Sequence, residues 1–371
     1  WISVPVALIA FPEYAAAMVI SCLILNFIIW LIGRAFNETY IKACEGMPNQ
    51  VRTMLKLYSI LENAGFENEL NKSLVKGDDK SKGAYDSLKE LNSVLRLAGL
   101  RSQPLFALIL NAVFPLDYII SNRMGNWAVK YGKELPAYID KLADLEALMC
   151  VAQTGLVLPL SSFPEFVESD KAEDNAFFEG SELAHPLLSL ESVVSNSVTI
   201  NKDIAIITGS NMSGKTTMIR TVGVCTILAM TGGLVPASAL KLGRMRVMSS
   251  MRIVDSIEEN MSTFKAELIR ISGIVKAAGE NKPLLFLIDE IFRGTNSDDR
   301  TEGALTVLKK LSMPYICGLM TTHDYAMIDK TTEEFKNIRY YHFSETYTDT
   351  GITFDYKLTS GISRQSNAKY L

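Results

Sequence analysis

One eight-residue segment limits what this chain can fold into more than any other feature. Gly209 to Thr216 reads GSNMSGKT and matches GxxxxGK[ST] at every fixed position. The apolar run Ile204–Ile207 precedes it, as expected for a buried parallel strand, and a helix is expected from Thr217 to about Met230. A strand, a glycine-rich turn and a helix in this order surround a phosphate with backbone N–H groups. The sequence therefore predicts an α/β P-loop domain that binds and hydrolyses ATP with Mg²⁺.

The fixed residues of the loop each have a chemical reason. Glycine lets the backbone turn inward around the β-phosphate, Lys215 reaches the β and γ oxygens, and Thr216 offers a hydroxyl to Mg²⁺. The N-terminus of the following helix adds a partial positive charge. The predicted nucleotide-binding residues are Gly209, Ser210, Asn211, Met212, Ser213, Gly214, Lys215, Thr216 and Thr217.

A second apolar run ends in two carboxylates. Leu284–Ile288 is followed by Asp289 and Glu290, and α/β sheets place ligands at the carboxyl ends of their strands. We expect Asp289 to hold Mg²⁺ through its waters and Glu290 to polarise the attacking water as general base. Such a string is also typical of a strand followed by a solvated turn. Its position after a phosphate loop favours the catalytic interpretation.

A third run, Leu319–Thr322, ends at His323 and Asp324. A histidine at this place can contact the γ-phosphate and sense its loss, so His323 joins Lys215 and Glu290 as a catalytic candidate. A single histidine is more often a structural hydrogen-bonding group, and both interpretations stay open here.

The first part of the chain predicts a membrane segment. Ala15 to Ile32 is interrupted only by Ser21 and Asn26, and with its neighbours it makes a helix over about 14–33. At about 1.5 Å per residue this helix is as long as a hydrocarbon core is thick. A soluble helix would show a polar face, and a signal peptide would need a basic residue before Arg34. We therefore favour a transmembrane helix over a core helix or a signal.

Basic residues after this helix set its orientation. Arg34 and Lys42 follow it, so the positive-inside rule puts the rest of the chain in the cytoplasm, at the cell (inner) membrane. Residues 1–11 are also apolar and are expected to be the end of an earlier span. The chain starts at Trp1, and we expect it to be part of a longer protein.

Between the membrane segment and the P-loop domain, apolar residues recur at helical spacing. One row is Tyr85, Leu88, Leu91 and Leu95, and a second is Leu135, Ile139, Leu142, Leu145, Leu148 and Met149. The apolar stretch 105–120 contains Asn111 and Asp117, which favours buried helices over a second span. The predicted domains are a membrane segment over 1–36, an all-α region over 37–170 and a P-loop domain over 171–371.

The composition gives only weak information about the class of binding partner. The formal net charge is −4, whereas strong binders of nucleic acid are usually basic, although a local basic patch remains compatible with this balance. The five cysteines are scattered with no CxxC pair, which favours reduced thiols in the cytosol and no zinc site.

Several ordered motifs resemble the ATPase domain of the MutS family, the mismatch-repair ATPases of the ABC superfamily. Residues 208–217 read TGSNMSGKTT, similar to TGPNMGGKST of that family, and residues 289–297 read DEIFRGTNS, similar to DEIGRGTS. Further matches are Thr321-Thr322-His323, Asp255, the Ser-Thr-Phe of 262–264, His185-Pro186 and the closing strand 352–358 with Gly361. The resemblance covers about 176–371 and extends into 135–150, which resembles the long helix joining the MutS core to its ATPase.

The resemblance implies a composite ATPase in which two subunits enclose two nucleotides, and thus a homodimer. Ser262, with Asn260 beside it, would then face the γ-phosphate on the opposing subunit, and a monomer would be nearly inactive. Asn260 and Phe292 depart from the family, which usually has glycine at both places. No segment resembles the mismatch-reading domain, and the membrane helix is foreign to ordinary MutS, so the chain resembles a membrane-anchored branch.

Three functions compete on this basis. The first is a MutS-type ATPase that binds DNA, including mismatched DNA, under the control of ATP. The second is a membrane-tethered ATPase switch that acts on a protein or envelope partner without mismatch recognition. The third, an ABC transporter subunit, is weakest because the chain has no LSGGQ string.

Overall fold

The chain divides into two compact units, Trp1–Leu148 and Met149–Leu371. The computed structural model describes residues 12–76, 83–158, 160–189, 191–210, 212–251, 263–292, 296–348 and 351–363. This division groups the predicted membrane segment with the helical region, and it groups residues 149–170 with the P-loop domain.

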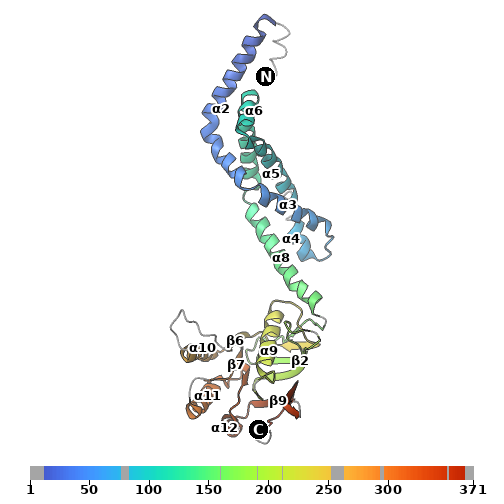
Figure 1. Ribbon diagram of the computed structural model, residues 1–371, viewed down its shortest axis with the longest axis vertical. Coiled ribbons are helices and arrows are strands. Elements are labelled where there is room, and N and C mark those ends of the chain that lie inside the picture. Colours follow the sequence, from blue (N-terminus) through green and yellow to red (C-terminus); the bar gives the residue numbers. More distant parts are fainter. Residues whose placement is uncertain are drawn as a thin grey trace. The chain divides into compact units, whose positions relative to one another are not determined.

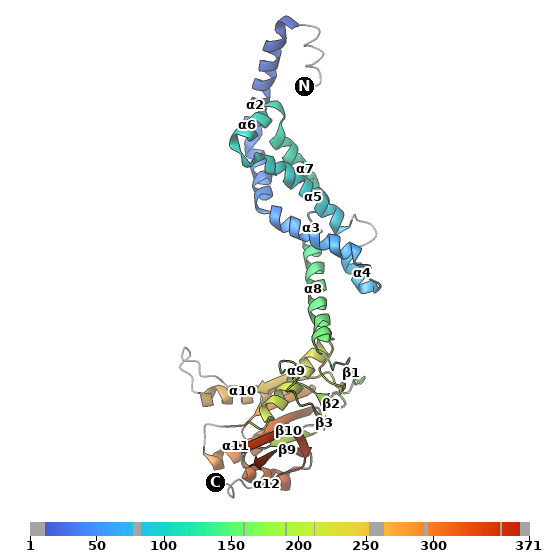
Figure 2. The ribbon, with the colours of Figure 1, turned by 45° about the vertical axis from the view of Figure 1, so that its right-hand side comes forward.

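The first unit is helical throughout its described residues (Figures 1 and 2). Its elements are η1 (Pro12–Tyr14), α2 (Ala15–Gly46), α3 (Pro48–Asn63), α4 (Glu69–Lys76), α5 (Ala84–Gly99), η2 (Leu100–Ser102), α6 (Pro104–Val113), α7 (Leu116–Tyr131) and most of α8 (Leu135–Val157). Helices thus fill most of the described residues of the region 37–170, which was predicted to be helical.

The core of the first unit forms where α3, α5 and α7 meet. Leu88, Leu91 and Leu95 of the first predicted row are buried in it, as expected for positions three and four apart on one helix face. The aromatic residues in this core keep their polar groups paired: Trp127 Nε1 donates to the carbonyl of Ser87 at 2.9 Å, and the Tyr58 hydroxyl donates to that of Tyr138 at 2.6 Å.

The second predicted row belongs only partly to a core. Leu145 is buried, but Ile139, Leu148 and Met149 of the same helix, α8, are exposed. The helical prediction for this segment holds, because α8 covers all of it. The apolar spacing here identifies a helix without identifying its packing partner.

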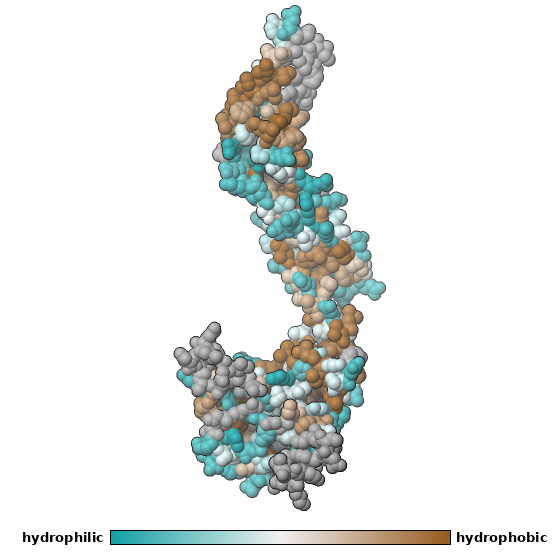
Figure 3. Space-filling view, in the orientation of Figure 1, coloured by the Kyte–Doolittle hydropathy of each residue, from teal (hydrophilic) through white to brown (hydrophobic). Residues whose placement is uncertain are grey.

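The apolar part of α2 has no fully buried residue. Among the described residues, one helix is long and apolar enough to cross a membrane. This part is the 19-residue segment Ala16–Arg34, and 0% of it is buried. Figure 3 shows the apolar side chains gathered over this part of the unit. The expected apolar helix is present; its membrane role is a proposal, argued below.

One prediction for the first unit is wrong. The stretch 105–120 is predicted to form buried helices, and α7 does bury Leu116 and Ile120, but α6 leaves Leu105, Phe106, Leu108 and Ile109 exposed. Its buried residue is the polar Asn111. The physical reason is that α6 turns by 113° from the preceding helical segment, so that it lies outside the core of α3, α5 and α7.

The second unit contains the predicted α/β domain. Its strands are β1 (Glu165–Phe166), β2 (Phe177–Leu183), β3 (Asn196–Asn201), β4 (Ile204–Thr208), β5 (Ala239–Leu242), β6 (Arg246–Ser250), β7 (Leu284–Asp289), β8 (Ile316–Thr321), β9 (Ile338–Thr348) and β10 (Gly351–Ser360). Its helices are the end of α8, α9 (Lys215–Met230), α10 (Thr263–Ala278), α11 (Ser297–Leu311) and α12 (Tyr325–Glu334).

A six-stranded sheet in the order β10-β9-β4-β8-β7-β6 forms the centre of this unit. All neighbours are parallel except β10, which pairs antiparallel with β9. A smaller sheet, β1-β5-β2-β3, stands beside it. The strands expected around the loop, before the acidic pair and before His323 are β4, β7 and β8. They are adjacent in the order β4-β8-β7, so their carboxyl ends meet at one edge.

Alternation along β4 shows how the layers are built. Ala205 and Ile207 face the core formed with α9 and the smaller sheet, whereas Ile204 and Ile206 face the core formed with α10, α11 and α12. Every residue of β4, β7 and β8 is buried, which explains their continuous apolar sequences. The mixed α/β fold agrees with the predicted fold class.

Candidate functional site

The phosphate loop joins the end of β4 to the start of α9. Its backbone is left-handed at Gly209 (φ 142°), Met212 (φ 71°) and Gly214 (φ 111°). A Cβ atom on Gly209 would lie 2.9 Å from Ser213 Oγ and 3.0 Å from the Phe343 carbonyl, so only glycine fits there. The loop therefore turns as its glycine pattern predicts. Asn211 lies outside the described residues.

Lys215 lies at the first position of α9 and is buried. Its ammonium group donates to the carbonyls of Gly209 at 2.8 Å and Ser210 at 2.7 Å. These bonds hold the cation within the loop, where a phosphate group would be bound.

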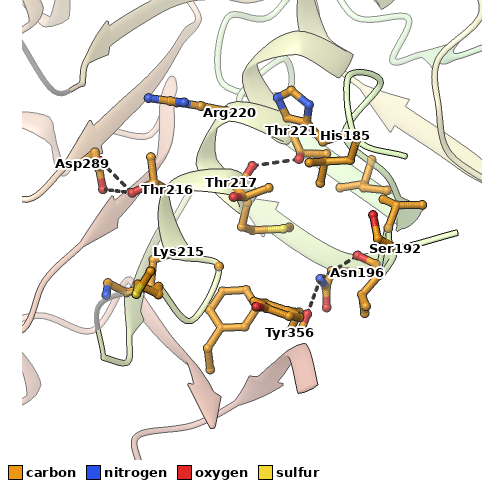
Figure 4. Close-up of a pocket in the computed structure, with 18 of the residues that line it drawn as sticks. His185, Ser192, Asn196, Lys215, Thr216, Thr217, Arg220, Thr221, Asp289 and Tyr356 are labelled. Atoms are coloured by element: carbon orange, nitrogen blue, oxygen red, sulfur yellow. Dashed lines mark hydrogen bonds between the residues drawn. The ribbon is translucent and has the colours of Figure 1, made fainter. Parts of the chain in front are cut away.

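The hydroxyl predicted to bind magnesium and the acidic residue predicted to support it are in direct contact. Thr216 Oγ1 lies 2.9 Å and 3.1 Å from the two carboxylate oxygens of Asp289, a contact drawn in Figure 4. Asp289 also accepts a hydrogen bond from Thr321 Oγ1 at 2.8 Å. Two elements distant in sequence thus bring oxygen ligands to one point at the end of β7.

Glu290 follows directly and has a left-handed backbone, with φ 54°. Its N–H donates to Thr321 Oγ1 at 3.0 Å, and its Oε1 lies 2.6 Å from His323 Nε2. His323 is thus in contact with the predicted general base. Of the two interpretations left open for His323, this contact fits the structural hydrogen-bonding group.

A cavity of about 860 Å³ opens beside the loop (Figure 4). Its size falls within the range of small-molecule sites. Of the predicted site residues, those that line it are Met212, Gly214, Lys215, Thr216, Thr217, Asp289 and Glu290. His323 is not part of the lining. Asn260 and Ser262, predicted to act on the opposing subunit, lie outside the described residues.

The cavity is also lined by residues that the site prediction did not include. They are His185, Asn196, Arg220 and Tyr356. Asn196 Nδ2 donates to the Tyr356 carbonyl at 2.9 Å and so ties β3 to β10. Burial, and then the nearby Arg220, lowers the pKa of His185, which favours a neutral imidazole at neutral pH. Asn196 and Tyr356 are 160 residues apart in the chain, so no short motif predicts their contact.

The departure at Phe292 has a structural explanation. Its backbone is left-handed, with φ 56°, which is the conformation that glycine adopts without strain. The ring is buried, packs edge-on against Phe264 with centroids 6.5 Å apart, and lies against Gly303. The Phe292 N–H also donates to the Glu267 carboxylate. Phe292 thus joins the turn after β7 to α10 and α11.

Together these contacts define a class of protein, the P-loop nucleotide-binding proteins with an acidic pair at the end of a neighbouring strand. Comparison with known proteins gives the family. Residues 205–369 match the family model for MutS domain V. These residues therefore form a domain of the MutS family, the family's ATPase domain.

Curated relatives agree with the family model. The chain is 28% identical over 247 residues to the DNA mismatch repair protein spellchecker 1 of Drosophila melanogaster, covering 64% of this chain and 26% of that protein. It is 29% identical over 242 residues to the DNA mismatch repair protein MSH2 of Saccharomyces cerevisiae, covering 61% and 25%. It is 28% identical over 207 residues to the putative endonuclease MutS2 of Bacillus subtilis, covering 53% and 25%. The chain spans about a quarter of the length of these relatives.

Proposed function

We propose that this chain is a dimeric MutS-type ATPase switch that binds and hydrolyses Mg-ATP in the cavity beside α9. The observation that carries the proposal is the geometry of the acidic pair. Asp289 touches the loop hydroxyl of Thr216, while Glu290 lines the same cavity and is held by Thr321 and His323.

The residues present fit a magnesium ion. Hydroxyl and carboxylate oxygens are the ligands that Mg²⁺ takes, and Thr216 and Asp289 bring one of each to the same point. Among the described residues no group of three His, Cys, Asp or Glu side chains is gathered as a metal site. Magnesium here would therefore depend on nucleotide phosphates and water for its other ligands, and would neutralise charge on the phosphates.

The proposed roles of the side chains follow from their positions. Lys215 and the N-terminus of α9 attract the phosphates. Glu290 takes a proton from the attacking water, and His323 fixes the direction of its carboxylate.

Replacing Lys215 by alanine should weaken ATP binding at least tenfold, measured by titration calorimetry. Unchanged affinity would show that the nucleotide binds elsewhere.

The resemblance to MutS supports a homodimer in which Ser262 completes the partner's site. ATP hydrolysis per mole of chain should then rise with protein concentration, and Ser262→Ala should lower the rate without lowering ATP affinity. A specific activity that stays constant over a hundredfold dilution would contradict the composite site.

Because its relatives include DNA mismatch repair proteins, we further propose that the chain binds DNA in an ATP-dependent manner in DNA repair. The test is the ATPase rate of the full chain with and without homoduplex, mismatched and branched DNA. Stimulation or a change in apparent ATP affinity supports this proposal. The absence of both stimulation and binding at low salt, where phosphate contacts are strongest, would rule this proposal out.

The apolar segment of α2, of which 0% is buried, favours a second candidate function. It is a membrane-tethered ATPase switch that acts on a protein or envelope partner. Arg34 and Lys42 after the segment support a cytoplasmic ATPase domain at the cell membrane. If DNA has no effect on an ATPase that fractionates with membranes, this second function becomes the better account.

A further inference from the structure

We propose that α6 lies inside the bilayer beside the membrane segment of α2, as a short helix that enters one leaflet and returns. This inference rests on the proposed membrane tether in α2 and goes beyond it by assigning a second, non-spanning element to the lipid. The partner is the hydrocarbon of the bilayer itself.

The exposed side of α6 is the first observation. Leu105 is 73% exposed and Ile109 is 52% exposed, and Phe106 and Leu108 are exposed as well. No charged residue occurs between Arg101 and Asp117. A soluble protein would bury such a helix face, whereas here the buried residue is Asn111. The polarity of α6 is therefore inverted relative to a helix in water.

The position of α6 is the second observation. Asn26, near the middle of the segment Ala16–Arg34, donates through Nδ2 to the carbonyls of Ala112 and Val113 at 3.1 Å and 3.3 Å. One helical turn further along α2, Trp30 Nε1 donates to Asp117 Oδ2 at 2.9 Å. The end of α6 is thus level with the centre of the membrane segment, and its apolar face continues the apolar face of α2 (Figure 3).

The polar groups at the end of α6 are satisfied within the protein, which is what the hydrocarbon requires. Besides the two carbonyls bonded to Asn26, that of Leu110 accepts from the Phe114 N–H at 2.7 Å. At the other end, Pro104 opens the helix and has no N–H to satisfy. Loss of water would therefore cost the end of this short helix little.

The charged groups next to α6 are those of one ion pair, in which Asp117 is buried and Arg101 is partly buried. Arg101 Nε lies 2.7 Å from Asp117 Oδ1, and Asp117 also accepts from Asn111 Nδ2 at 3.1 Å and from Trp30. A carboxylate with this many donors and a paired cation can stand at the boundary of an apolar layer. Ten residues at about 1.5 Å rise give about 15 Å, half of a hydrocarbon core, so α6 is too short to cross.

The test is the accessibility of nitroxide labels on the full chain in vesicles of phosphatidylcholine and phosphatidylglycerol. Cys22 and Cys150 are replaced by alanine. Cys44, Cys225 and Cys317 are buried and can remain, because burial raises the pKa of their thiols, to about 12 for Cys225, and shields them from the reagent. Labels are then placed one at a time at exposed positions.

The variants are Leu105→Cys and Ile109→Cys on α6, Ile28→Cys on α2 as lipid control, and Val129→Cys on α7, 87% exposed, as water control. We expect both α6 labels to collide more with oxygen than with a nickel chelate, as the Ile28 label does, and the Val129 label to show the reverse. If the α6 labels collide mainly with the nickel chelate, as the Val129 label does, while the Ile28 label collides mainly with oxygen, the inference about α6 is wrong and the membrane tether in α2 stands. If the Ile28 label also collides mainly with the nickel chelate, both the inference and the tether are wrong.

Discussion

Thr321 lies between the two acidic residues of the site and bonds to both. Its hydroxyl donates to Asp289 and accepts from the N–H of Glu290, and the residue is buried. The register of the sheet makes this possible, because Asp289 and Thr321 are paired across β7 and β8. A threonine at the end of β8 therefore holds the carboxylate of Asp289 and the backbone of Glu290.

Replacing Thr321 by valine keeps the shape and removes the hydroxyl. The Glu290 N–H then loses its partner, so we expect unfolding free energy to fall by about 1–3 kcal/mol. We also expect a turnover number about tenfold lower, because the base loses a positioning contact. Thr321→Ser restores the hydroxyl and should recover most of the rate. Equal kinetics for the valine and serine variants would contradict the role.

Two left-handed residues, separated by Ile291, also mark this place. Glu290 and Phe292 have φ values of 54° and 56° without being glycine, a conformation that costs about 1–3 kcal/mol per residue. Packing of Phe292 and the hydrogen bond from its N–H to Glu267 offset this cost. The carboxylate of Glu290 is thus held by its surroundings rather than by its own preference.

At the scale of elements, Phe292 and Gly303 fit together between β7 and α11. A Cβ atom on Gly303 would lie 2.8 Å from Phe292 Cε2, so the missing side chain of one makes room for the ring of the other. Gly303→Ala should lower the unfolding free energy by about 1–3 kcal/mol, measured by urea unfolding. In a Phe292→Ala background the same change should cost less. Equal costs in both backgrounds would show that the two positions are independent.

The start of α12 provides a prediction about pH. Asp324 caps this helix by accepting from the N–H groups of Ala326 and Met327, and it also accepts from Thr301 and Arg300. Burial opposes its ionisation, but these hydrogen bonds and the Arg300 charge outweigh burial and lower the pKa of the carboxyl below its usual value of 3.8.

A carboxyl with a lowered folded-state pKa adds stability above its unfolded pKa and loses it as pH falls through the folded pKa. We therefore expect Asp324→Asn to be less stable than the parent at pH 7, and expect the difference to shrink below about pH 4. Urea midpoints measured from pH 7 to pH 3 give this comparison. A difference that does not change with pH would show that the carboxylate charge contributes nothing.

At the scale of the whole molecule, the sequence predicted the features that contiguous residues encode and missed those that depend on contacts between distant residues. The loop from Gly209 to Thr216 and the run before Asp289 are contiguous, so their strands and helix could be placed from sequence. The contacts of Thr321 and Glu267 depend on strand register and helix packing, which no short motif encodes. The exposure of α6 could not be predicted either. Polar residues such as Asn111 and Asp117 within an apolar stretch are compatible with a buried helix in a soluble protein and with a helix that contacts lipid.

The central claim is that Glu290 is the base for ATP hydrolysis by this chain. The most direct test is steady-state ATP hydrolysis by the full chain at saturating Mg-ATP, comparing the parent with Glu290→Gln, with ATP affinity measured on both. The change removes the proton acceptor and keeps the size, so we predict a rate lower by about 10²–10⁴-fold with affinity preserved. A glutamine variant that turns over ATP at the parent rate would contradict the account.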